Sequence, residues 1–81
     1  MRWFRLPKHR NISGEKVVKV LCNTFGFTIS GRSGSHVRLT RVDKGTKTGT
    51  VVSLHDELKP GTLYGILKLA KIDPEEFFRH L

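Results

Sequence analysis

Apolar residues in the first third of the chain follow a helical spacing between Ser13 and Gly26. With Thr24 they recur every three or four residues, which places all five on one helix face: Val17, Val20, Leu21, Thr24 and Phe25. Ser13 is suited to cap the start of this helix, and the carboxylate of Glu15 in the first turn interacts favourably with the helix dipole. Gly26 is suited to end it. The pattern predicts an amphipathic helix between these two residues.

The middle of the chain alternates between apolar and polar residues with the period of two that is typical of strands. Three such runs occupy residues 27–30, 35–41 and 48–54, with turns at 31–34 and 43–46. Short connections between consecutive strands predict an antiparallel meander. In the outer strands, Phe27, Ile29, Val52 and Leu54 are expected on the apolar face.

The second strand carries the most informative alternation. Val37 and Leu39 share one face, whereas His36, Arg38 and Thr40 share the other. The turn before it, bracketed by Gly31 and Gly34, would let a ligand's backbone approach closely.

Two further helices are predicted in the last third. The polar link 55–61 precedes Thr62, a candidate N-cap, and the next helix carries one apolar stripe: Leu63, Ile66, Leu67 and Ala70. Gly65 inside this helix costs about 1 kcal/mol relative to alanine, and close packing is the expected reason for it. Asp73 followed by Pro74 marks the start of a short last helix, in which Phe77 and Leu81 close the core.

Together these elements predict an α+β fold, in the order helix, three antiparallel strands, helix and short helix. Each long helix has one apolar stripe and the sheet has one apolar face, so both helices are expected on a single face. The opposite face, with His36, Arg38 and Thr40, is then open. Residues 12–81 form one domain, preceded by a basic arm at residues 1–11.

Charge indicates the class of partner. The 81 residues include 15 Lys+Arg against 7 Asp+Glu, a net charge of +8, which favours a polyanion such as nucleic acid. Arginines beside aromatic residues in the arm could grip phosphates and bases, or the aromatics could pack on the domain. A single cysteine excludes an internal disulfide. With no apolar run of membrane-spanning length, we expect a soluble, cytoplasmic protein.

Several kinds of chemistry are poorly supported. The four histidines, His9, His36, His55 and His80, have no metal-ligand spacing, and no Walker-type loop is present. Cys22 has no local base and is expected to be a core residue. We therefore predict neither a metal nor another cofactor.

A histidine surrounded by cations could still catalyse general acid–base cleavage of RNA without a metal ion. Imidazole can take the proton from an RNA 2′-hydroxyl, so that this oxygen attacks the adjacent phosphate. Cations around it could stabilise the phosphate charge, and the turn could approach the RNA backbone. The candidate phosphate-binding residues are Arg32, Ser33, Gly34, Ser35, Arg38, Lys47 and Lys59. His55 either completes the site or has a structural role, which we favour.

The motif Gly34-Ser35-His36 resembles the HicA family of toxins from HicAB toxin–antitoxin modules. The resemblance extends from Ser13 to about Phe78 and includes the third strand, Val51-Val52-Ser53-Leu54-His55. Its second helix has the pattern Glu57-Leu58-x-x-Gly61-Thr62-Leu63-x-x-Ile66-Leu67-x-x-Ala70, followed by Ile72 and Glu75-Glu76-Phe77.

The resemblance implies a double-stranded-RNA-binding-like fold and a metal-independent mRNA endonuclease. It places the catalytic histidine at His36, and it implies a HicB-like antitoxin that covers this surface. The chain departs from the family pattern in its N-terminal arm, in Ser53 where proline is common, and in Lys71 where glycine is common. A non-catalytic RNA-binding module and a domain that binds only an acidic protein are the alternatives.

Overall fold

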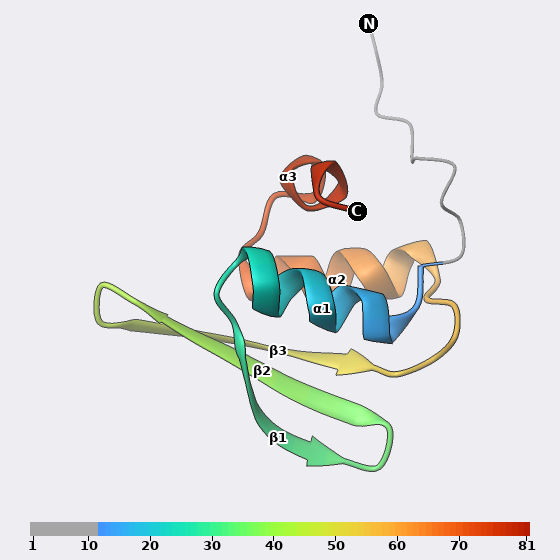
Figure 1. Cartoon of the computed structure of the whole chain (residues 1–81), viewed down its shortest axis with the longest axis horizontal. Coiled ribbons are helices and arrows are strands. Elements are labelled where there is room, and N and C mark those ends of the chain that lie inside the picture. The colour runs from blue at the N-terminus through green and yellow to red at the C-terminus, as the bar shows by residue number, and fades with distance from the viewer. Residues whose placement is uncertain (1–11) are drawn as a thin grey trace, which may run out of the picture.

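The computed structural model describes residues 12–81, and the arm predicted at residues 1–11 lies outside them. The elements follow the predicted order of helix, three strands and two helices (Figure 1). Their bounds are α1 Gly14–Thr24, β1 Thr28–Ser33, β2 His36–Asp43, β3 Thr46–Ser53, α2 Pro60–Ala70 and α3 Pro74–Arg79.

The three strands form the predicted antiparallel meander in the order β1-β2-β3. β2 is central, pairing with β1 from Thr40 to His36 and with β3 along its whole length. The β2–β3 turn consists of Lys44 and Gly45, both with positive φ. This conformation matches the twist of a two-residue hairpin, and glycine adopts it at little cost.

α1 and α2 lie on one face of the sheet, and α3 packs on the far side of these helices (Figure 1). The core fills the space between the layers and includes Val17, Leu21, Phe27, Leu39, Val52, Leu67 and Phe77. A hydrogen bond ties α2 to the sheet, since the buried Thr50 hydroxyl donates to the Ile66 carbonyl over 2.9 Å. The prediction of a sheet covered on a single face is confirmed.

The start of α1 is fixed to the end of β3. Ser13 is the N-cap, and its hydroxyl accepts from the Lys16 amide over 3.1 Å, as predicted. The Gly14 amide donates to the His55 carbonyl over 2.9 Å. A side chain at Gly14 would collide with the Ser53 carbonyl. Only glycine therefore allows this close approach of helix to strand.

β1 differs from the prediction in length and in burial. It runs on to Ser33, so the β1–β2 turn consists of Gly34 and Ser35 alone and not of residues 31–34. A register shift between Ile29 and Gly31 marks a bulge. Ile29 pairs with the buried Leu39, yet it is 59% exposed. The helices pack over β3 rather than over β1, so the predicted burial of Ile29 is wrong.

α2 also begins differently from the prediction. Lys59 is its N-cap and Pro60 its first residue, so Thr62 lies inside the first turn instead of capping it. The predicted apolar stripe, Leu63, Ile66, Leu67 and Ala70, is buried. Nothing lies within 4 Å of a Cβ added at Gly65. Close packing is therefore not the reason for this glycine.

α3 begins after Asp73 with Pro74 in its first turn, as predicted, although the Asp73 side chain makes no cap hydrogen bond. Phe77 is fully buried, and Phe78 makes an edge contact with Tyr64 of α2. α3 thus closes the outer side of the helix layer. No helix within residues 12–81 is long and apolar enough to cross a membrane.

Candidate functional site

His36 is the first residue of β2 and is exposed. Its register partners are Ser33 on β1 and Ser53 on β3, and directly paired residues share a face of a sheet. Val37, the next residue, points to the opposite face and is buried. The imidazole therefore lies on the open face, between two serines.

The turn before His36 is anchored to the next strand. The Ser35 carbonyl accepts from the Leu54 amide over 2.7 Å. Gly34 has a φ of 60°, and no atom lies within 4 Å of a Cβ added to it. Ser33 lies on the same face as His36, whereas Ser35 lies in the turn. The turn thus holds a fixed backbone against which a ligand could lie.

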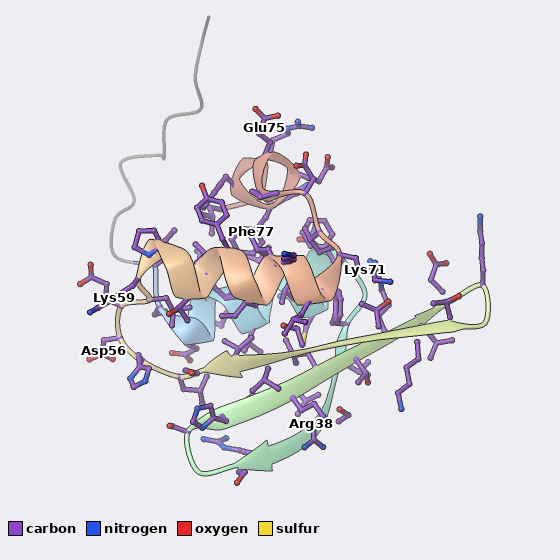
Figure 2. All side chains as sticks on the ribbon, turned by 180° about the vertical axis from the view of Figure 1, so that it is seen from behind. Arg38, Asp56, Lys59, Lys71, Glu75 and Phe77 are labelled. Atoms are coloured by element: carbon purple, nitrogen blue, oxygen red, sulfur yellow. The ribbon has the colours of Figure 1, made fainter. Side chains whose placement is uncertain are left out.

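Arg38 shares the open face with His36, two residues along β2 (Figure 2). Its register partner on β1 is Gly31, and a Cβ at Gly31 would lie 3.0 Å from the Arg38 guanidinium. The guanidinium therefore lies across Gly31, toward the free edge of the sheet. Residues two apart in a strand, such as His36 and Arg38, are separated by about 7 Å. One phosphate group and its sugar can bridge this distance.

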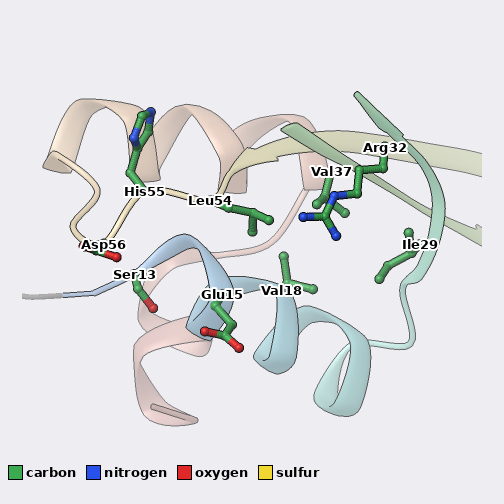
Figure 3. A pocket seen from close by; sticks show the side chains of 9 residues that line it. All are labelled: Ser13, Glu15, Val18, Ile29, Arg32, Val37, Leu54, His55 and Asp56. Carbon is green, nitrogen blue, oxygen red and sulfur yellow. The ribbon is translucent and has the colours of Figure 1, made fainter. Parts of the chain in front are cut away.

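Arg32 points to the other face. It pairs with the buried Val37, so its side chain lies on the helix side of the sheet. There it lines a groove of about 410 Å³ between α1 and the β1–β2 hairpin, opposite Glu15 and Val18 of α1 (Figure 3). Its Nε donates to the Gly34 carbonyl over 3.4 Å. The structure therefore does not bring Arg32 to the face of His36.

Lys47 lies on the open face but at its far end. It pairs with Val42, six residues along β2 from His36. At the rise of a strand, this places the two residues about 20 Å apart. Lys47 is thus too distant to contact a phosphate that His36 touches.

Lys59 and His55 lie at the same end of the molecule as His36. Lys59 precedes α2 (Figure 2). With His55 and Ser53 it lines a pocket beside the end of β3. α1, α2 and the β1–β2 turn all begin or end here (Figure 1). The N-termini of α1 and α2 at this end favour an anion, whereas Asp56 and Glu57, which also line this pocket, oppose one.

The comparison with protein families gives a match over most of the chain. The model of the HicA toxin of bacterial toxin–antitoxin systems matches residues 14–72. The chain belongs to the HicA toxin family. No curated protein and no solved structure matched it.

This HicA chain is therefore a toxin of a toxin–antitoxin system. The match spans α1 through α2 and ends at Ile72, before α3. His36 and the turn Gly34-Ser35 lie inside it, as does Arg38. The family resemblance inferred from the sequence is confirmed.

Two residues at this end were not predicted as site residues from the sequence. Ser53 is paired directly with His36 and also lines the pocket beside Lys59. Thr62, expected only as a cap, lines that pocket as well. Counting the register back from the β2–β3 turn places Ser53 opposite His36, so a signal for it was present.

Neither a metal cluster nor an activated thiol is found in the described part of this HicA toxin. Within residues 12–81 no group of three or more His, Cys, Asp or Glu could hold a metal ion. Cys22 packs at the edge of the core, half-buried, and burial raises the pKa of its thiol. A raised pKa disfavours the reactive thiolate, which agrees with the predicted packing role.

Proposed function

We propose that this HicA toxin is a metal-independent endoribonuclease that cleaves mRNA, with His36 as its general acid/base. The observation that carries the proposal is an exposed histidine on the open face of the sheet, in a chain of the HicA toxin family. The net charge of +8 suits an RNA substrate.

The reaction needs one group that moves a proton at neutral pH, and imidazole is suited to this. His36 takes the proton of a 2′-hydroxyl, and the 2′-oxygen forms a bond to the adjacent phosphorus. The bond from phosphorus to the 5′-oxygen breaks, and that oxygen takes up a proton from the imidazolium. The products are a 2′,3′-cyclic phosphate and a 5′-hydroxyl.

Arg38 is the cation best placed to stabilise the charge that develops on the phosphate, because it shares the face of His36. Lys59 at the start of α2 can hold a second phosphate at the same end of the molecule. Arg32, on the helix side, instead holds the turn through the Gly34 carbonyl.

The substrate chemistry can be tested with two oligonucleotides in EDTA. RNA should be cut and leave a 2′,3′-cyclic phosphate, whereas the same sequence with 2′-deoxyribose throughout should remain intact. Cleavage of the deoxy strand, or a need for added metal ion, would contradict the proposal. RNA that is bound but never cut would favour the non-catalytic module.

His55 can be assigned in the same assay. Its backbone carbonyl accepts the Gly14 amide, and this bond does not need the imidazole. His55→Ala keeps the bond and removes only the ring. We expect the variant to cleave RNA at the rate of the parent; a large loss would place the ring in the site.

The antitoxin is the second part of the proposal. A HicB-like protein that covers the face of His36 and Arg38 would exclude RNA from both side chains. We expect the purified complex to be inactive on RNA, and substitution of Arg38 by glutamate to weaken the complex by reversing a charge. A complex that forms fully and still cuts RNA would contradict this mode of inhibition.

A further inference from the structure

The open face carries features that cleavage at His36 alone does not use. Val42 of the central strand is 68% exposed, and Val51 of β3, which pairs with Arg38, is 44% exposed; both lie on this face. The two valines lie four register positions apart, so they form two separate apolar positions along the face and not one patch. Lys47 lies at the far end of the face, level with its register partner Val42.

Glycines on both strands that flank β2 leave positions on this face from which no side chain projects. Gly31 pairs with Arg38 from the β1 side, and Gly49 pairs with Thr40 from the β3 side. A Cβ at Gly49 would meet the Thr40 methyl at 3.5 Å, an ordinary contact distance. The strand could therefore accommodate a side chain there, and its absence leaves room for a ligand to approach the backbone.

From these positions we infer that the open face is a binding track for single-stranded RNA, starting at His36 and ending at Lys47. The inference rests on the proposed function, and it extends it by naming the form of the RNA and the course of the strand. Arg38 holds a phosphate near the cleaved bond, and Lys47 holds one farther along. Bases of the strand rest on Val51, beside Arg38, and on Val42, beside Lys47.

The length and chemistry of the face fit a single strand. His36 and Lys47 are about 20 Å apart, and single-strand sites in small domains take about four nucleotides or more. Base faces can reach Val42 and Val51 only in a single strand, because in a duplex they are stacked inside. The valine side chains can contact any base, because they form no base-specific hydrogen bond. The aromatic side chains of the described residues lie on the helix side and in α3.

The test compares two charge-removing variants made in a His36→Ala background, so that the RNA probe stays intact. The probe is a single strand of about ten nucleotides of mixed sequence. Lys47→Gln should weaken binding about two- to fivefold. It should also lower the slope of log affinity against log salt by about 0.7. Lys19→Gln on α1, an exposed lysine outside the track, is the matched control.

A second variant tests whether the missing side chain at Gly49 matters for RNA binding. The Cβ added by Gly49→Val makes only ordinary contacts, and valine suits β structure, so the unfolding midpoint should hold or rise. RNA affinity should nevertheless fall at least as much as in Lys47→Gln. Unchanged affinity in a folded Gly49→Val protein would contradict the track.

The outcomes separate the track from the proposed function. If the parent cuts RNA but Lys47→Gln binds like Lys19→Gln, or if a duplex of the same sequence binds as tightly as the single strand, the track is wrong and the cleavage stands. If the parent never cuts RNA while the variants bind as predicted, the track stands and the cleavage mechanism is wrong.

Discussion

The two faces of the sheet are built from the same strands but differ in what each position requires. On the covered face of β2, Val37 and Leu39 are buried against the helices. On the open face, His36 and Arg38 are exposed one residue away. Because alternate residues of a strand point in opposite directions, the residues that form the core and the residues proposed for catalysis occupy neighbouring positions. Each can therefore be changed while the other is left in place.

Leu39→Ala should have the largest effect, because its side chain is fully buried. We expect the free energy of unfolding to fall by about 2–5 kcal/mol. Arg38→Ala, the neighbouring residue on the open face, should change it by about 0.5 kcal/mol or less. Denaturant unfolding measures both changes. Similar losses of stability in the two variants would contradict the claim that only the covered face stabilises the fold.

Gly14→Ala should have the next largest effect. The added methyl group collides with the Ser53 carbonyl, so α1 must shift away from the end of β3. A loss of about 1–3 kcal/mol is expected in thermal or denaturant unfolding. Gly61→Ala is the control, since no atom lies within 4 Å of its added Cβ. Equal stability of the two variants would contradict the close contact.

Thr50→Val should cost about 1 kcal/mol in the free energy of unfolding, because the buried hydroxyl donates to Ile66. Thr40→Val, on the open face of β2, is the matched control and should be nearly neutral. A loss in Thr40→Val as large as that in Thr50→Val would show that the two faces do not differ here.

Gly65→Ala should have the smallest effect, and a favourable one. Gly65 is exposed inside α2, and the space around it is empty. We expect a gain of about 0.5–1 kcal/mol in the free energy of unfolding. The same change at Gly34, whose φ is 60°, should instead cost about 1 kcal/mol. Destabilisation by both changes would contradict this assignment.

The alternation of apolar and polar residues predicted the order of elements and the face of His36, because successive side chains of a regular strand point to opposite faces. It did not predict the course of β1. Gly31 and Ser33 are residues typical of turns, yet they lie in the strand beyond a bulge. The longer strand pairs Arg32 with Val37, which places Arg32 on the helix side.

Other differences depend on how the elements pack. Ile29 follows the alternation correctly but is exposed, because neither helix covers β1 closely. The start of α2 was missed because Thr62 is a good cap, whereas Pro60 actually occupies the first turn. Lys47 was grouped with His36 by charge, and only the register showed that they lie at opposite ends of the face.

The rate of RNA cleavage by His36→Ala tests the central claim most directly. The account predicts a fall of about 10²–10⁴-fold relative to the parent, the range for loss of a general acid or base. The unfolding midpoint should not change, since His36 is exposed. His80→Ala, which removes another exposed imidazole from the far side of the molecule, should cleave like the parent. A folded His36→Ala variant that cuts RNA at the parental rate would contradict the account.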